Sequence, residues 1–144
     1  MGNDSDQQFS SEISPVGWYV GSYQLRFIEL NEAGNDDLEA SFLVWENTVI
    51  VRAEDLEEAF QKVEAVGLQQ TEPYQGGSEG VPVQWIFEGI TSLLPIYEAL
   101  EDGSEIMWEK HDSVKLSELR GQSVSLEKIR ERFRSDRAER EQWD

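Results

Sequence analysis

A single histidine is the only imidazole that the sequence offers for catalysis or metal binding. His111 stands in the run Glu109-Lys110-His111-Asp112, where Asp112 could orient its ring as a general base or a metal ligand. A catalytic histidine also needs a nucleophile, and the sequence contains neither a G-x-S-x-G nucleophile elbow nor a second histidine. We therefore expect no catalytic residue and keep His111 as a candidate binding residue.

Carboxylates are the second group of side chains that could do chemistry. Glu88, Glu98, Glu105 and Glu109 lie close in sequence, and a converging pair could transfer protons or bind a hard cation. The chain has 30 acidic residues, however, so that some carboxylates lie near one another by chance. We expect no metal site and no cofactor, and we retain Glu88 and Glu105 as candidate binding residues.

The charge balance restricts the partners. Lys and Arg together number 12 against 30 acidic residues, for a formal net charge of -18, which argues against binding to nucleic acid. The chain has no cysteine, which removes disulfides and thiolate zinc sites. The glycines at 76, 77 and 80 do not form a phosphate loop, because no Gly-Lys-Ser/Thr sequence follows them. An acidic surface of this size could instead bind a cationic protein.

The residues that carry these groups must be positioned by strands and a helix. A run rich in aromatic and β-branched residues predicts a first strand from Trp18 to Ile28. A polar break at 31–37 and a second apolar run from Ser41 to Arg52 complete a hairpin. Glu46-Asn47 interrupts the second run, and we expect an irregularity there.

One helix is expected after this hairpin, from Glu54 to Leu68. Apolar residues recur along it at the three- and four-residue spacing of one helical face: Leu56, Ala59, Phe60, Val63 and Val66. Acidic residues occupy its first turns, where the helix dipole favours them, and Gly67 is placed to end it in a left-handed conformation.

Two further strands are expected beyond a glycine-rich loop at 69–80. The alternation from Val81 to Ile90 predicts a strand, in which Gly89 could allow a bulge, and Pro95 argues against its continuation. Asp102-Gly103 predicts a tight turn into a fourth strand, Ser104 to Lys110. The resulting fold class is α+β with the order ββαββ: a four-stranded, mostly antiparallel sheet with one helix packed on one face.

The ends of the chain differ from this central domain at 15–116. We expect residues 1–14 to be a disordered lead-in and residues 117–144 to be a charged, partly helical tail, with Ser125 as an N-cap. No apolar run approaches the length of a membrane span, and the acidic start does not resemble a secretory signal. We expect a cytoplasmic protein that binds neither membranes nor nucleic acid.

The tryptophans suggest a self-associating protein. Trp18, Trp45, Trp85 and Trp108 all fall on expected strands, and strand alternation makes it improbable that all four point toward one helix. The second face of the sheet then requires a cover. We expect a second copy of the chain to supply it in a homodimer, with the tail contributing in cis or in trans; alternatively, the tail is solvated and that face is only partly apolar. Trp85 and Trp108 are candidate binding residues.

Four segments resemble a known family. They are Trp18-Tyr19-Val20, Val49-Ile50-Val51 with the following Ala53 and Glu57-Glu58-Ala59, Trp85-x-Phe87-x-Gly89-Ile90, and Leu100-Glu101-Asp102-Gly103-x-Glu105-Ile106. In this order they are similar to a small bacterial family, domain-of-unknown-function family 4288, over about residues 17 to 110. The resemblance supports the two-hairpin fold and implies no activity, catalytic residue or cofactor.

These observations predict a small acidic protein of unknown function that acts by binding and not by catalysis. The leading hypothesis is a self-associating interaction or regulatory module. The alternative is an acidic inhibitor or immunity-type protein that binds a cationic partner. A second alternative is a weak metal-dependent hydrolase that uses Glu88, Glu105 and His111.

Overall fold

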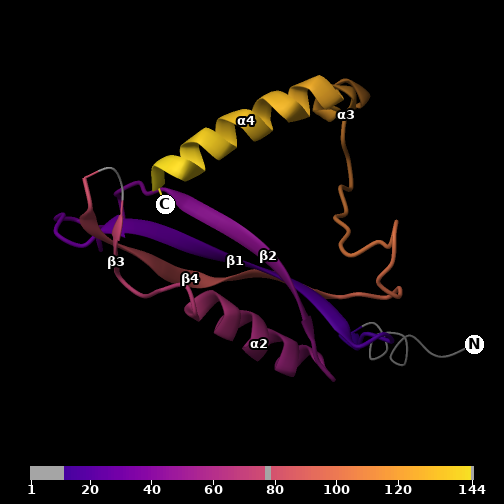
Figure 1. Cartoon of the computed structure of the whole chain (residues 1–144). Coiled ribbons are helices and arrows are strands. Elements are labelled where there is room, and N and C mark those ends of the chain that lie inside the picture. The colour runs from indigo at the N-terminus through magenta and orange to yellow at the C-terminus, as the bar shows by residue number, and fades with distance from the viewer. Residues whose placement is uncertain (1–11, 77–78, 144) are drawn as a thin grey trace, which may run out of the picture. The chain divides into compact units, whose positions relative to one another are not determined.

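A computed structural model describes residues 12–76 and 79–143 of the chain (Figure 1). The chain falls into two compact units, one of residues Met1–Tyr74 with Pro82–Trp108 and the other of residues Gln75–Val81 with Glu109–Asp144. The first unit carries most of the sheet and the helix that packs on it.

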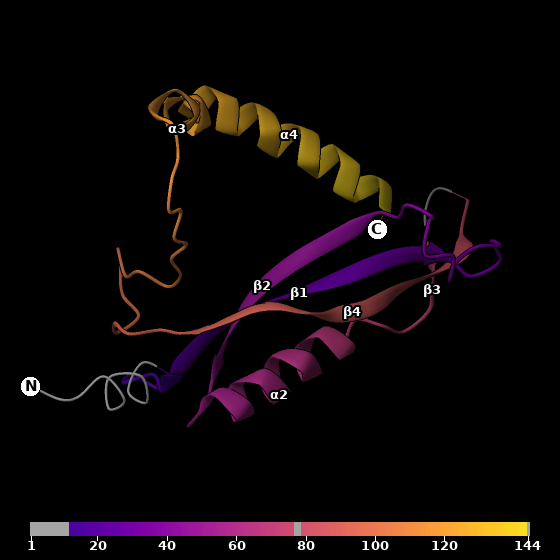
Figure 2. The same ribbon diagram turned by 180° about the vertical axis from the view of Figure 1, so that it is seen from behind.

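A four-stranded sheet is the centre of the described structure. Its strands are β1 (Trp18–Glu29), β2 (Val44–Arg52), β3 (Tyr74–Gly76) and β4 (Val81–Pro95), in the spatial order β2-β1-β4-β3. The long first strand pairs antiparallel with both β2 and β4. Helix α2 (Leu56–Leu68) follows β2 and lies along one side of the sheet (Figure 2). The predicted α+β class and the order ββαββ are confirmed.

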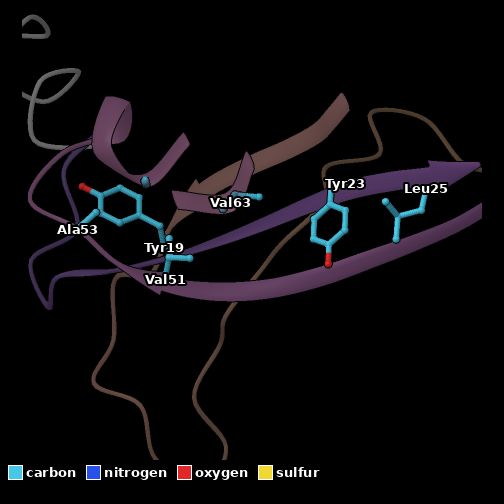
Figure 3. Close-up of a cluster of buried hydrophobic side chains, with 7 residues drawn as sticks. Tyr19, Tyr23, Leu25, Val51, Ala53 and Val63 are labelled. Atoms are coloured by element: carbon cyan, nitrogen blue, oxygen red, sulfur yellow. The ribbon is translucent and has the colours of Figure 1, made fainter. Parts of the chain in front are cut away.

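The core lies between this helix and the sheet. Alternate residues of β1 point toward α2, because successive side chains of a strand point to opposite faces. They pack with residues of β2 and α2 in one buried cluster (Figure 3), which consists of Tyr19, Tyr23, Leu25, Val51, Ala53, Ala59 and Val63. The ring of Tyr23 also lies 5.9 Å from that of Phe87 on β4. This cluster fixes how α2 is oriented on the sheet.

The second hairpin is not where the sequence pattern placed it. The glycine-rich segment predicted to be a loop contains β3, and this strand precedes β4. The predicted fourth strand, Ser104 to Lys110, has no regular structure. The Asp102-Gly103 turn does form, with Ser104 N donating to the carbonyl of Glu101 (3.0 Å) and a φ of 87° at Gly103. A local turn signal therefore identified the turn correctly, but no strand follows it.

Strand β4 is longer than predicted and irregular at its middle. It continues past Ile90 and ends at Pro95, whose missing N–H is tolerated at the end of a strand. Its register against β1 shifts on both sides of Gln24, the partner of Gly89. Gly89 has a φ of 142°, which favours glycine, so the bulge expected there is confirmed. The irregularity expected at Glu46-Asn47 is wrong, because β1 and β2 pair without a break.

Helix α2 begins at Leu56, two residues later than the expected start at Glu54. The side chain of Asp55 accepts a hydrogen bond from the N–H of Glu58 (2.8 Å), as an N-cap does. Gly67 does not end the helix in a left-handed conformation: it lies inside α2, buried, and Gln69 is the C-cap in the right-handed region. The close approach of Phe87 explains this glycine instead.

The second unit holds two helices, α3 (Leu116–Gln122) and α4 (Leu126–Trp143). Ser125 is placed as the predicted N-cap, since its Oγ accepts from the N–H of Lys128 (3.2 Å). Among the helices of the described residues, none combines the length and the apolar character that a membrane crossing requires.

The predicted lead-in lies mostly outside the described residues, which begin at Glu12. At its end, Ser14 is buried: its N–H donates to the Tyr19 hydroxyl (3.0 Å) and its Oγ donates to the carbonyl of Ile96 (2.5 Å). Ser14 therefore links the segment before β1 to the segment after β4.

Candidate functional site

Trp85, a candidate binding residue, lies on the side of the sheet that faces α2. Its ring is 5.0 Å from that of Phe27 and 6.5 Å from that of Trp45, and it packs against the core cluster. Its Nε1 donates to the hydroxyl of Tyr74 (3.1 Å). These contacts indicate that Trp85 and Trp45 stabilise the fold.

The other two tryptophans do not form an aromatic sheet face either. Trp18 alternates with the core residue Tyr19, so it points to the opposite face, where the guanidinium of Arg52 lies 4.8 Å from its ring. Trp108 lies outside the strands, 49% exposed, with its ring 6.0 Å from that of Tyr97. The face opposite α2 therefore carries one of the four tryptophans and not the cluster that the sequence suggested.

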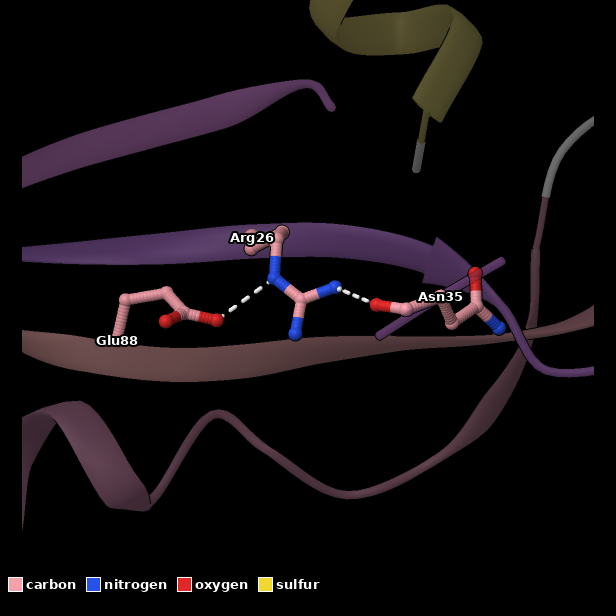
Figure 4. Close-up of polar contacts among 3 residues, drawn as sticks. All are labelled: Arg26, Asn35 and Glu88. Carbon is pink, nitrogen blue, oxygen red and sulfur yellow. Dashed lines mark hydrogen bonds and ion pairs between the residues drawn. The ribbon is translucent and has the colours of Figure 1, made fainter. Parts of the chain in front are cut away.

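Glu88 lies on the bulged part of β4 and binds Arg26 of β1 (Figure 4). Its Oε1 is 2.6 Å from Nε of Arg26, and the same guanidinium donates to the carbonyl of Asn35 (2.7 Å). The guanidinium also stacks 4.6 Å from the ring of Phe42. A cavity of 390 Å³ adjoins these residues. The guanidinium of Arg26 therefore joins the sheet to Asn35 and Phe42 of the 30–43 loop and restrains that loop.

The remaining predicted residues have local partners. The N–H of Glu105 donates to Oε2 of Glu98 (3.1 Å) in the first unit. His111 belongs to the second unit, with Nε2 at 3.9 Å from Oε1 of Glu109. Within the described residues, no group of three or more His, Asp or Glu side chains could hold a metal ion.

An apolar groove on α2 lies beside the core and was not predicted. It has a volume of 920 Å³ and lies between one side of α2, Leu93 of β4 and Ile13. Its apolar lining consists of Ile13, Leu56, Phe60 and Leu93, and Phe60 is 45% exposed although it is a large aromatic residue. An exposed apolar surface with a polar rim is typical of a site of protein–protein contact.

The rim of this groove is acidic. Four carboxylates line it, from Glu12, Asp55, Glu57 and Glu64, with Gln61 as the remaining polar residue. None of the described residues that line the groove is basic. Because Glu57 and Glu64 are seven residues apart on one helix, they lie about 10.5 Å apart along its axis on the same side. The groove suits an apolar ligand that also carries positive charge.

A pattern in the sequence could have indicated this groove. The predicted apolar face of α2 is wide, and Phe60 stands at its edge, next to Glu57 and Glu64 on the adjoining strip of the helix. Ala59 and Val63 are fully buried and mark the centre of the contact with the sheet, whereas Phe60 projects beside it. Leu93 and Ile13 complete the groove, but both are distant from α2 in the sequence. No sequence pattern indicated that they would lie beside this helix.

The segment after β4 is a second exposed apolar surface. Large side chains at 39% to 49% exposure recur along residues 97–108, namely Tyr97, Leu100, Ile106, Met107 and Trp108. Burial and the neighbouring Tyr19 raise the pKa of the Tyr97 hydroxyl above its ordinary value. This segment has no regular structure that would make it a preformed site.

The comparisons with known proteins identify a family and assign no activity. A family model described as "Domain of unknown function (DUF4288)" matches residues 18–108, which confirms the resemblance expected for about residues 17 to 110. No curated protein and no solved structure matches the chain.

Proposed function

We propose that this chain, which belongs to the DUF4288 family, is a non-enzymatic protein-binding module that self-associates as a homodimer in the cytoplasm. The α2 groove carries the proposal. The groove is preformed by a helix and a strand that are anchored in the core, so that a partner would not need to order it. Its exposed Phe60 offers the kind of aromatic anchor on which binding energy concentrates.

The non-enzymatic part of the proposal is supported by where the candidate catalytic groups lie. The carboxylate of Glu88 is engaged by Arg26, the backbone N–H of Glu105 donates to Glu98, and the ring of His111 lies beside Glu109. None of these three residues lines the α2 groove. A site that binds by apolar contact and charge has no need of a general base.

One observation favours the alternative of an acidic inhibitor or immunity-type protein. The four carboxylates at the groove, within a chain of net charge -18, would attract a cationic partner and accelerate its encounter. On this alternative the partner would be a different, basic protein, and binding would depend mainly on charge.

Sedimentation velocity of the full chain over a wide concentration range tests the proposal. We expect the mass of two chains, persisting at about 0.5 M NaCl, because salt screens charges but not apolar contact. A monomer at every concentration would reject self-association. A monomer that captures a basic protein from its own cell at low salt, and releases it at high salt, would favour the inhibitor alternative.

A further inference from the structure

Helix α4 has an apolar stripe that is exposed in the structure. Leu126, Ile129 and Phe133 follow the three- and four-residue spacing of one helical face and are each about half exposed or more. At 100° per residue, Arg130 and Arg134 lie immediately to one side of this stripe. A helix with so narrow a stripe gains little from folding alone in water, so that a surface that covers the stripe would stabilise it.

The α2 groove matches this helix in spacing and in charge. Leu56 and Phe60 are four residues apart, as are Ile129 and Phe133, so that each pair covers about one helical turn. Glu57 and Glu64 border the apolar strip of the groove on one side, where α4 would present its arginines. Apolar contact at the centre with opposite charges at the border is the arrangement by which amphipathic helices bind grooves.

We infer that the α2 groove of one chain binds helix α4 of a second copy. The inference rests on the self-association proposed above and identifies its interface. In a two-fold dimer the exchange is reciprocal, because each chain provides one groove and one helix. Two reciprocal contacts bury twice the area of one, and specific interfaces bury roughly 1,200 to 2,000 Å² in total.

Charge distinguishes α4 from the segment that precedes Glu12 in the sequence. Residues 1–11 precede Glu12 at the groove, but their sequence contains two aspartates and no basic residue. Residues 126–137 carry five basic and three acidic residues. Only the second segment relieves the mutual repulsion of the four carboxylates at the rim.

Charge reversal tests the interface with chains that remain full length. In one variant Glu57→Arg and Glu64→Arg make the groove basic; in the other Arg130→Glu and Arg134→Glu make the helix acidic. We expect the dissociation constant of the dimer to be at least tenfold higher for each variant alone than for the wild type. Mixed in equal amounts, the two should form a heterodimer, because each reversed groove then faces a reversed helix and each native groove faces a native helix.

The control for the groove variant reverses two carboxylates away from the groove, Glu32→Arg with Glu39→Arg, which raises the net charge by the same amount and should leave the dimer intact. Circular dichroism checks that every variant is folded. A wild-type dimer that neither groove nor helix reversal weakens would overturn this interface and leave self-association standing. A wild-type monomer would reject both. Variants that dissociate alone but do not pair when mixed would also overturn the reciprocal contact.

Discussion

Gly67 of α2 lies directly against the ring of Phe87 of β4. A Cβ atom at position 67 would stand 2.6 Å from Cδ2 of Phe87 and 3.2 Å from Cδ2 of Tyr23. The absence of a side chain therefore allows two aromatic rings to fill the space between the helix and the sheet. Gly21 of β1 has the same role beneath Val63, where an added Cβ would lie 2.7 Å from Cγ2. Two glycines thus set the distance at which α2 packs.

The first prediction concerns Gly67→Ala. In an exposed helix interior, alanine is more favourable than glycine by about 1 kcal/mol. At position 67, however, the added methyl group would displace Phe87 and Tyr23. We expect a net loss of about 1–3 kcal/mol in the free energy of unfolding, measured with urea. Gly121→Ala in α3 is the control, because a Cβ there meets nothing within 4 Å, and it should cost no stability. Equal behaviour of the two variants would contradict the packing argument.

How much of the fold the sequence predicts depends on whether the signals are local. The β1–β2 hairpin and α2 were predicted because each is a long run with its own periodicity. The strand β3 was missed because three residues, Tyr74–Gly76, form no pattern and depend on pairing with β4. The strand predicted at 104–110 is wrong for the converse reason: its composition is suitable, but a strand requires a neighbour, and no local signal provides one.

The groove was harder to predict than the fold. Glu88 was predicted only as a candidate binding residue; in the structure its carboxylate binds Arg26, which is 62 residues away in the sequence and also contacts the 30–43 loop. The sequence places Phe60 on the apolar face of its helix. Its position in an open groove with Leu93 and Ile13 is apparent only in the tertiary structure. Surfaces made by residues distant in sequence require the tertiary structure.

The second prediction concerns Arg26→Met, which keeps the aliphatic stem and removes the guanidinium. Arg26 joins Glu88, Asn35 and Phe42, so its loss should free the 30–43 loop from the sheet. We expect faster hydrogen exchange in that loop and a loss of about 1 kcal/mol in global stability. Glu88→Gln should have a smaller effect, because the contacts to Asn35 and Phe42 remain. Unchanged exchange in Arg26→Met would show that the loop is held by other contacts.

The third prediction concerns the pH dependence of stability at Tyr97. Burial and the nearby Tyr19 raise the pKa of Tyr97 in the folded state above that of the unfolded chain, about 10. The folded state then holds the proton more tightly, so the stabilisation is complete below about pH 10 and declines as the pH rises further. Above about pH 10, the unfolding free energy of the wild type should therefore fall relative to that of Tyr97→Phe. A constant difference across that range would refute the prediction.

The fourth prediction concerns divalent cations. Because the guanidinium of Arg26 occupies the carboxylate of Glu88, that side chain is a poor metal ligand. We expect isothermal titration with Mg²⁺, Mn²⁺ or Zn²⁺ to show only heats of dilution. A saturable site that Glu88→Gln or His111→Ala abolished would instead support the hydrolase hypothesis and count against a purely binding function.

The fifth prediction compares two exposed apolar residues. Phe60 in the groove and Ile50 on β2 are 45% and 44% exposed, so that exposure alone gives no reason for them to differ. Phe60→Ser should weaken self-association tenfold or more, whereas Ile50→Ser should leave the dissociation constant unchanged, because only Phe60 lies where the partner helix binds. Sedimentation equilibrium at low salt and at about 0.5 M NaCl measures the dissociation constants of both variants. If Ile50→Ser weakened the dimer and Phe60→Ser did not, the interface would lie on the sheet face opposite α2, to which Ile50 points, and the groove would have no part in it.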